Sequence, residues 1–217
     1  MGPCDGCHAG CCRSLAVPVT GADLLRIERD RGIMLEDSLC RWADPEDRVG
    51  RGIAPHFRFA DNASVPYVIG LRHVASETHF GTTRCEFLIE EPPSVDAPLG
   101  RGRCGIHESR PLACRTFPAK LNTTGELTIL SEPPRSGREA EHPVYGLCPR
   151  PWRAEDVDPL ELPGDLARAR FERDFFWSVS RLWNESAGGF EEFPGFLRWV
   201  YGNRVLGAER EGIRRAA

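Results

Sequence analysis

The chain has 217 residues, of which 41% are hydrophobic and 28% are charged, and its formal net charge at pH 7 is -4. A chain of this length buries a core of its own, so it does not need metal merely for want of apolar residues. The mildly acidic balance excludes a general nucleic-acid binder, because neutralising phosphates requires a basic face. No run approaches the roughly 20 apolar residues that span a bilayer.

The start of the chain and its cysteine content bear on the compartment. Residues 1–12 have neither the basic start nor the apolar stretch of a signal peptide. We therefore expect a cytoplasmic protein, in which cellular thiols keep cysteine pairs reduced. The sequence has 9 cysteines, too many to be incidental in such a compartment. Metal ligation or redox chemistry is the explanation that these cysteines favour.

In the first half of the chain the pattern predicts one helix and several short strands. Thr20, with Asp23 three residues on, has the spacing of a capping box and predicts a helix through about Arg31. Runs of β-branched and aromatic residues bounded by turn residues predict short antiparallel strands over 65–74 and 85–89.

Loops and two helices account for much of the rest. Residues 36–65 show no sustained period and are expected to be loop, apart from one short strand over 56–59. The segment 91–103 is rich in proline and glycine and is expected to be a hairpin-like excursion. Helical spacing of large apolar residues predicts a helix beginning near Pro163 and a second one after Pro194.

Eight cysteines form a pattern of two blocks with flanking positions. The first block is a glycine-rich loop at the N-terminus; the second lies in the middle of the chain, with one cysteine on either side of it. In order, these metal-ligand candidates are Cys4, Cys7, Cys11, Cys12, Cys85, Cys104, Cys114 and Cys148. Zinc sites and iron–sulfur clusters take thiolates from separate parts of the chain, usually four per centre. Cys40 is left over and is expected to pack beside Trp42.

The number of centres stays open at this point. Adjacent cysteines such as Cys11 and Cys12 rarely chelate one ion together, because successive side chains of an extended backbone point in opposite directions. One of the two therefore faces a second centre or stays free. Eight thiolates fill either two four-cysteine sites or one cluster with spare cysteines. His8 and His107 lie within the blocks, where a histidine is more often a hydrogen-bond donor near the metal than a ligand.

The two blocks make the sequence resemble a known family. The resembling segments are the four N-terminal cysteines, Cys85-Glu86-Phe87-Leu88, Cys104-Gly105-Ile106, Glu108, Arg110-Pro111, Cys114-Arg115, Phe117-Pro118 and Cys148. The sequence is similar to the CxxCxxCC cysteine-cluster family, also called YkgJ-like and described as zinc- or iron-chelating. The resemblance covers roughly the first two-thirds of the chain. It implies that the patterned cysteines chelate a metal.

Two features depart from the family pattern. Three residues separate Cys7 from Cys11, where the family's name implies two, and His107 occupies a place often taken by tyrosine. The first changes the shape of the loop without removing a thiol. The second departure leaves open whether His107 is a metal ligand.

One branch of the family suggests a reaction. It contains flagellin lysine N-methylases, in which the cysteine domain is associated with an iron–sulfur centre and methyl transfer from S-adenosylmethionine. The resemblance thus implies methylation-like chemistry by analogy alone. No glycine-rich nucleotide loop such as G-x-G-x-x-G occurs in this sequence. Whether the protein is an enzyme is left undecided.

The sequence as a whole predicts a small irregular α+β fold. Short antiparallel strands and metal-binding loops are expected in a cysteine-cluster domain over 1–155, covered by an N-terminal helix and by C-terminal helices. Residues 156–217 are expected to form a helical extension packed on that domain.

The expected function is metal binding through an iron–sulfur cluster of the 4Fe-4S type, for redox or protein-modification chemistry. The alternative is a zinc-stabilised structural or protein-binding module without catalysis. A protein is the expected partner in either case, and neither a nucleic acid nor a membrane is expected. A thiol oxidoreductase using Cys4-x-x-Cys7 is weaker, because the strand–helix context of thioredoxin-like folds is lacking.

Overall fold

The computed structural model describes residues 7–47, 49, 53–121, 124, 126–129, 137–148 and 151–216, with the backbone alone for 154 and 205–216. The chain divides into two compact units, each made of two stretches. The first unit comprises Met1–Val17 and Gly70–Phe171, and the second comprises Pro18–Ile69 and Glu172–Ala217. We call them the cysteine unit and the aromatic unit.

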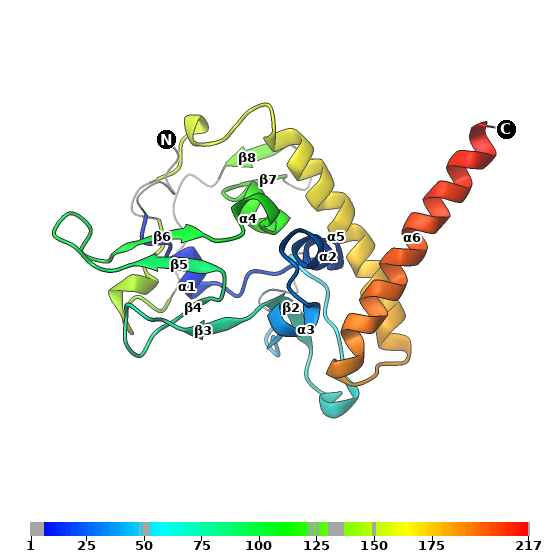
Figure 1. Cartoon of the computed structure of the whole chain (residues 1–217), viewed down its shortest axis with the longest axis horizontal. Helices are drawn as coiled ribbons and strands as arrows, with labels where there is room; N and C mark the ends of the chain where they lie inside the picture. The colour runs from blue at the N-terminus through cyan, green and yellow to red at the C-terminus, as the bar shows by residue number, and fades with distance from the viewer. Residues whose placement is uncertain are drawn as a thin grey trace. The chain divides into compact units, whose positions relative to one another are not determined.

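The cysteine unit is built from short helices and two-stranded sheets. Its elements are α1 (Cys11–Ser14), β3 (His73–Ala75), β4 (Thr83–Cys85), β5 (Leu88–Glu91), β6 (Arg101–Cys104), η2 (His107–Ser109), α4 (Leu112–Thr116), β7 (Ala119–Leu121), β8 (Leu127–Ile129), η3 (Pro143–Tyr145), η4 (Ala154–Asp156) and the first part of α5 (Leu162–Glu185). Strands β3–β4, β5–β6 and β7–β8 pair antiparallel. In Figure 1 the first two pairs are drawn in green beside the blue α1.

A small apolar cluster joins the third sheet of the cysteine unit to the start of α5. Ala119 of β7 packs against Leu162 and Leu166, and all three are buried. Leu121 and Ile129 cover the cluster from the same sheet. Further buried apolar side chains of this unit include Leu88, Ile106, Leu112 and Val144.

The aromatic unit contains most of the long helices. Its elements are α2 (Gly21–Arg31), α3 (Leu35–Ser38), β1 (Leu39–Ala43), η1 (Ala60–Asn62), the greater part of β2 (Tyr67–Leu71), the remainder of α5, η5 (Phe190–Glu192) and α6 (Phe193–Ala216). Strand β1 pairs with β2. The second part of α5 and the start of α6 lie side by side in Figure 1.

Helix α2 begins where the sequence predicts. The Asp23 amide donates to Thr20 Oγ1 at 3.2 Å and the Thr20 amide donates to Asp23 Oδ2 at 3.0 Å, which completes the capping box. Gly21 allows close packing on α6, because a Cβ at this position would lie 2.3 Å from the Tyr201 ring. The local signal and the tertiary contact therefore agree at this helix start.

Buried aromatic rings form the core of the aromatic unit. Phe193 lies 5.0 Å from Phe57, 5.5 Å from Phe59 and 5.0 Å from Trp183 between ring centroids. Phe57 also lies 4.9 Å from Phe176. Edge-to-face and tilted contacts of this kind add to the stabilisation that burial of the rings provides.

We expect Phe193→Ala to lower the free energy of unfolding by about 3–5 kcal/mol, because the cavity cannot be refilled by the packed neighbouring rings. Denaturant unfolding followed by circular dichroism measures this change. Phe80→Ala is the matched control, since the Phe80 side chain is fully exposed and its removal should leave stability unchanged. Equal effects of the two substitutions would contradict this account of the core.

Ion pairs connect three helices of the aromatic unit. Arg198 of α6 donates to Glu36 at 2.7 Å and 2.8 Å, and it also pairs with Glu28 of α2. The hydrogen bond from Arg198 lowers the pKa of Glu36 from 4.5 to about 2, although the slight burial of the carboxyl acts in the opposite direction.

The low pKa of Glu36 predicts a specific pH dependence. A carboxyl whose pKa is lower in the folded state contributes stability above its unfolded pKa, and this contribution is lost as pH falls from about 4.5 towards 2. Glu36 is partly exposed, so solvent limits the pair to about 0.2–1 kcal/mol. Glu36→Gln should be less stable than the wild type at pH 7 by that amount, and the difference should vanish near pH 2. Denaturant titrations at both pH values test this, and a difference that grows in acid would contradict it.

The predicted α+β class, with short antiparallel strands and C-terminal helices, is confirmed. The prediction of loop over 36–65 with a strand over 56–59 is wrong in part. Helix α3 extends to Ser38, β1 and η1 lie within the segment, and 56–59 contributes only an isolated bridge between Phe57 and Tyr67. The pairing of β1 with β2 and the bridge of Phe57 to Tyr67 join segments far apart in the chain, and such pairing leaves no local pattern. The division into 1–155 and 156–217 stays a prediction.

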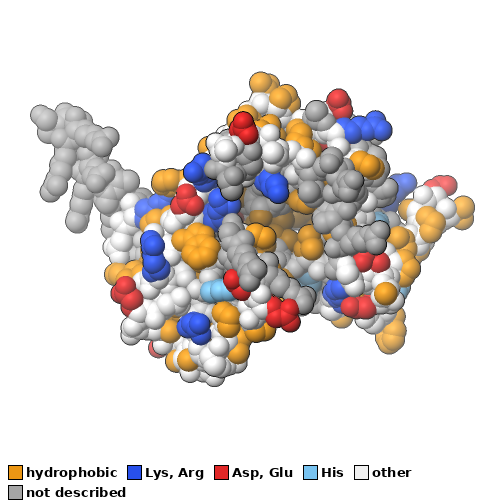
Figure 2. All heavy atoms as spheres, turned by 180° about the vertical axis from the view of Figure 1, so that it is seen from behind, with side chains coloured by type: hydrophobic (Ala, Val, Ile, Leu, Met, Phe, Trp, Pro, Cys, Tyr) orange, Lys and Arg blue, Asp and Glu red, His pale blue; other side chains and the backbone are white. Residues whose placement is uncertain are grey.

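Among the described residues, no helix is both long enough and apolar enough to cross a membrane. On the face drawn in Figure 2, hydrophobic side chains lie among charged ones.

Candidate metal centre

The patterned cysteines that the structure describes all belong to the cysteine unit. They are Cys7, Cys11, Cys12, Cys85, Cys104, Cys114 and Cys148. Cys4 lies outside the described residues. Cys40 lies in β1 of the aromatic unit, where its thiol is 3.7 Å from the Arg41 carbonyl oxygen.

The N-terminal loop is held against two other segments by its backbone. The amide of Gly102, which lies two residues before Cys104, donates to the Cys7 carbonyl at 2.8 Å. His8 Nε2 lies 2.7 Å from the Gly146 carbonyl oxygen, two residues before Cys148. These contacts bring the first cysteine block beside cysteines that are far away in sequence.

The contact between Gly10 and Gly146 leaves no room for a side chain. A Cβ at Gly10 would lie 1.8 Å from the Gly146 carbonyl oxygen and 2.9 Å from His8 Nε2. Backbone atoms cannot move aside as a flexible side chain would. The absence of a Cβ at Gly10 is therefore required for this close approach.

We expect Gly10→Ala to displace the loop and to lower the metal content of the purified protein by at least about half, because thiolates of a shared site must converge to bind it. Metal analysis per chain measures the effect. Gly164→Ala is the matched control, since a Cβ at Gly164 meets nothing within 4 Å. Full metal content in Gly10→Ala would show that the close approach is not needed.

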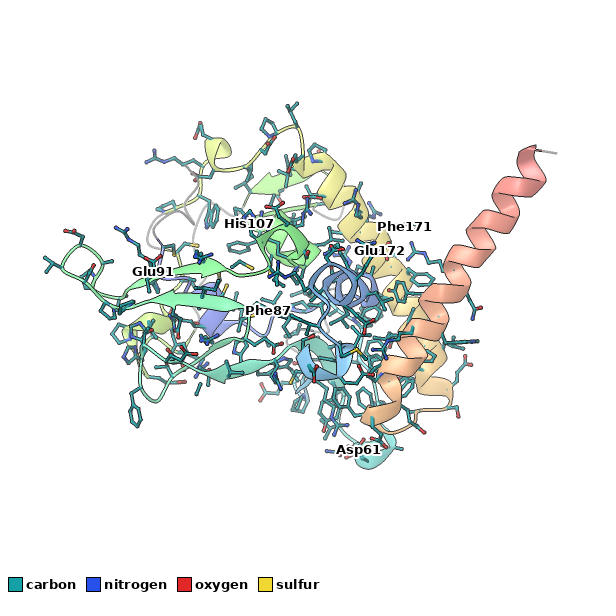
Figure 3. The ribbon with its side chains drawn as sticks, in the orientation of Figure 1. Asp61, Phe87, Glu91, His107, Phe171 and Glu172 are labelled. Atoms are coloured by element: carbon teal, nitrogen blue, oxygen red, sulfur yellow. The ribbon has the colours of Figure 1, made fainter. Side chains whose placement is uncertain are left out.

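The two antiparallel pairs place Cys85 and Cys104 at the same end of β5 and β6. Cys85 ends β4 opposite His73, and Cys104 ends β6 opposite Leu88. The Gly105 amide donates to the Phe87 carbonyl at 2.8 Å. Figure 3 labels Phe87 at this end of β5 and Glu91 at the other end. The register of these strands thus sets the positions of both cysteines.

Cys114 and Cys148 come from a helix and a loop. Cys114 lies in α4. The Cys114 amide donates to the Pro111 carbonyl at 2.9 Å and so closes the first turn of this helix. Trp152 Nε1 donates to Cys148 Sγ at 3.1 Å, and the Trp152 ring meets Phe117 edge-on at 5.2 Å. The indole therefore orients the Cys148 sulfur, a role that the sequence pattern did not indicate.

The Cys12 thiol lies among other cysteines. A hydrogen bond shared with Cys11 raises the pKa of Cys12 well above its ordinary value, and burial and the charges of Cys11, Cys114 and Cys85 raise it further. The same hydrogen bond lowers the pKa of Cys11 to about 7, although burial acts in the opposite direction. Helix α1, which carries Cys12, contacts β4, which ends at Cys85.

The thiols of Cys85 and Cys148 also have raised pKa values. Burial, together with the charge of Cys104, raises the pKa of Cys85 to about 11. Burial raises the pKa of Cys148, and the charges of Cys11 and Cys7 act in the same direction. Thiols crowded in this way are costly to ionise together unless a cation shares the site, because each thiolate repels the next.

A buried ion pair fixes α1 to β5. Arg13 Nη1 lies 2.5 Å from Glu90 Oε1, and both side chains are almost fully buried. Arg13 Nε also donates to the His8 carbonyl at 3.2 Å. Burial opposes ionisation of Glu90, but hydrogen bonds from Ser76 and the Glu77 amide, with the charge of Arg13, lower the pKa of Glu90 to about 2. Arg13 thus connects the N-terminal loop, α1 and β5.

The two histidines of the cysteine blocks differ in their surroundings. The contact of His8 with the Gly146 carbonyl holds the loop that carries Cys7. His107 is 61% exposed, and its ring nitrogens contact Glu108 and Arg110. Figure 3 shows His107 beside α4. Both described nitrogen contacts of His107 are therefore with groups other than cysteines.

A carboxylate–histidine group in the aromatic unit was missed by sequence reasoning. His56 Nε2 lies 3.0 Å from Asp44 Oδ2 and 3.7 Å from Asp47 Oδ1. Asp44 Oδ2 also accepts a hydrogen bond from the Val49 amide at 3.0 Å. The spacing of these residues along the chain follows no ligand motif, so only the fold reveals the group. Its hydrogen bonds hold a loop together.

The donor set of the cysteine unit fits a thiophilic metal group. The described cysteines form no disulfide with one another, and thiolates select zinc, copper(I) and iron–sulfur clusters. Within the described part of the chain, one group of three potential ligands has donor atoms that all lie within 4.8 Å of one another, and it consists of Asp44, Asp47 and His56. No three of the described cysteines form such a group. Sulfurs around one tetrahedral zinc ion lie about 3.8 Å apart, given a Zn–S bond of about 2.3 Å. No three of the described thiols therefore lie as close together as the ligands of one such zinc ion.

Comparison with known families agrees with this donor set. Residues 3–133 match the model of the CxxCxxCC family, whose description is "Putative zinc- or iron-chelating domain". The match covers more than half of the chain. The chain belongs to the CxxCxxCC family. No match to a curated protein or to a solved structure was found.

Membership of the CxxCxxCC family supports metal binding by this chain, with zinc and iron as the metals in the family's description. The matched segment contains all the patterned cysteines except Cys148. Cys148 lies beyond residue 133, yet the N-terminal loop that carries Cys7 contacts Gly146, two residues before Cys148, through His8. The fold therefore adds a cysteine to the region that the family match defines.

Proposed function

We propose that this CxxCxxCC protein holds an iron–sulfur cluster of the 4Fe-4S type through the patterned cysteines and uses it in redox or protein-modification chemistry. The proposed ligands come from Cys4, Cys7, Cys11, Cys12, Cys85, Cys104, Cys114 and Cys148. The observation that supports this proposal is the convergence of cysteine-bearing segments that are distant in sequence, with no three described sulfurs all within 4.8 Å of one another.

The surrounding residues support such a group in three ways. Trp152 donates a hydrogen bond to the Cys148 sulfur, and hydrogen bonds to sulfur are one of the factors that set cluster potentials. The Arg13–Glu90 pair holds α1, which carries Cys11 and Cys12. Backbone contacts at Gly102 and Gly146 hold the N-terminal loop. When bound, a cluster of this class exchanges single electrons.

Metal and acid-labile sulfide analysis, with a visible spectrum, tests the proposal on full-length protein purified without air. We expect iron with matching sulfide and a visible charge-transfer absorption. Colourless protein with negligible iron would refute the proposal. If iron and sulfide are found, titration of the redox potential and binding of S-adenosylmethionine separate a redox role from a methylation-like one.

A zinc-stabilised structural or protein-binding module is the second candidate, and the family's description favours it by naming zinc. In that case the same analysis gives stoichiometric zinc without sulfide. Zinc has no redox chemistry, so the thiolates would then serve folding alone. A search for a protein partner would follow from that result.

A further inference from the structure

A buried indole reaches one of the patterned sulfurs. Trp152 is 7% exposed, and its Nε1 donates a hydrogen bond to Cys148 Sγ at 3.1 Å. An indole has a single N–H, which usually finds a hydrogen-bond partner when it is buried. Here the partner is a sulfur, which is only a weak acceptor as a neutral thiol. Hydrogen bonds to an ionised acceptor are roughly twice as strong as neutral ones. The position of the indole therefore suits a charged Cys148 better than a neutral one.

Packing fixes the direction of this N–H. The Trp152 ring meets the Phe117 ring edge-on, with 5.2 Å between the centroids and 89° between the planes. Phe117 follows directly on α4, and its amide donates to the Ala113 carbonyl at 3.3 Å. Trp152 thus joins the segment of Cys148 to the end of α4. Protein contacts alone hold the N–H towards the sulfur.

The loop that contacts Gly146 supplies a second N–H donor to a sulfur. The Ala9 amide donates to Cys7 Sγ at 3.4 Å. Ala9 has a φ of 57°, in the left-handed region that residues other than glycine rarely adopt. The Cys12 amide donates to the Ala9 carbonyl at 3.0 Å and so supports this conformation. Since His8 joins the same loop to Gly146, both segments of this contact direct an N–H donor at a cysteine sulfur.

We propose that Trp152 is a positioning residue of the metal centre, whose indole N–H stabilises the negative charge of the metal-bound Cys148 thiolate. Reduction adds negative charge to a cluster, so a hydrogen bond to its sulfur favours the reduced form and raises the reduction potential. The same hydrogen bond withdraws charge from the sulfur and lowers its reactivity towards electrophiles. This inference rests on the proposed function, since it requires Cys148 to bind metal. Trp152 lies outside residues 3–133, so the family match does not define this role.

The test compares Trp152→Phe with the wild type as full-length proteins purified without air, after circular dichroism has confirmed folding. Phenylalanine keeps a ring beside Phe117 but has no N–H. We expect unchanged iron and sulfide contents and a lower reduction potential in a titration followed by visible absorption. At the wild-type midpoint potential, the ratio of reduced to oxidised cluster should fall at least about threefold, because a hydrogen bond to a charged group is lost.

Two control variants separate the N–H from packing. Trp183→Phe removes a similarly buried indole in the aromatic unit, whose N–H donates to the Arg58 carbonyl at 2.7 Å. Phe117→Leu loosens the ring contact of Trp152 but keeps its N–H. Neither control should change the reduction potential. A decrease in either control as large as that in Trp152→Phe would overturn the inference.

A zinc protein would refute the proposed function but would still test the role of Trp152. Iodoacetamide should then alkylate Cys148 at least about threefold faster in zinc-loaded Trp152→Phe than in the wild type, because the N–H no longer withdraws charge from the sulfur. Peptide mass spectrometry measures this rate, which should stay unchanged in both controls. Equal rates in Trp152→Phe and the wild type would overturn the inference.

The iron-loaded outcomes separate the two ideas in the opposite direction. Full iron content with an unchanged potential in Trp152→Phe would overturn the inference and leave the iron–sulfur function intact. Complete loss of metal from folded Trp152→Phe would also overturn it, because tuning of a potential does not require the N–H for ligation. A readout on the wild type does not depend on the variants. With isotopically labelled indole nitrogens, pulsed electron paramagnetic resonance of the reduced protein should detect hyperfine coupling to Trp152, and its absence would contradict the hydrogen bond. In a zinc protein, nuclear magnetic resonance after cadmium substitution should detect coupling of the metal to the same N–H, with the same consequence if it is absent.

Discussion

Removing the metal should unfold the cysteine unit and leave the aromatic unit folded. The patterned cysteines that the structure describes all lie in the cysteine unit, whereas aromatic rings in edge-to-face contact fill the core of the aromatic unit. Without a cation, the crowded thiols contribute repulsion or buried polar groups rather than bonds. Because metal binding free energy is then folding free energy, its removal should destabilise one unit selectively.

Hydrogen–deuterium exchange on the full chain measures this selectivity. Metal is removed with a chelator under reducing, anaerobic conditions, so that the thiols are not oxidised. Amides of β4, β5, β6 and α4 should exchange at least about 100-fold faster, which corresponds to about 2.7 kcal/mol. Amides of α2 should keep their protection, and they serve as the internal control. Equal loss in both units, or no loss in the cysteine unit, would contradict the expectation.

Breaking the Arg13–Glu90 pair should have the next largest effect. Arg13→Met keeps most of the side-chain volume but leaves the Glu90 carboxylate buried without its closest cation. Loss of one partner of a buried pair typically costs about 3–5 kcal/mol. Arg84 also contacts Glu90, at 3.0 Å, and should reduce the loss towards the lower end of that range.

Denaturant unfolding of the metal-loaded protein tests the Arg13 prediction, with metal content measured in parallel. The double variant Arg13→Met, Glu90→Gln should recover part of the stability, because it removes the unpaired charge. Arg29→Met is the matched control: Arg29 pairs with Asp30 on the surface and is 75% exposed, so no measurable change is expected. If Arg13→Met were as stable as Arg29→Met, the pair would have no structural role.

Arg13 and Arg115 each follow a cysteine along the chain but pair with carboxylates from other segments. Arg13 pairs with Glu90, and Arg115 Nε lies 3.0 Å from Asp165 Oδ2. Both carboxylates are distant in sequence, so the pairing depends on the fold.

Local chemistry made several features predictable from the sequence. The Thr20 capping box depends on residues three apart, and helical spacing after Pro163 depends on one turn, so both predictions are confirmed by α2 and α5. The type of site was readable for the same reason, since eight cysteines in ordered blocks indicate a thiophilic metal whatever the fold. The family match over residues 3–133 bears out that prediction of metal binding.

Only the tertiary structure decided which cysteine-bearing segments are neighbours. Cys7 and Cys148 are remote in sequence, yet the loop that carries Cys7 contacts Gly146 through Gly10 and His8. Strand register places Cys104 opposite Leu88, and the Arg13–Glu90 pair joins α1 to β5. Each of these contacts joins segments that are far apart in the chain, so no local pattern predicts it. The sequence therefore identifies the candidate ligands, while long-range contacts place the segments that carry them.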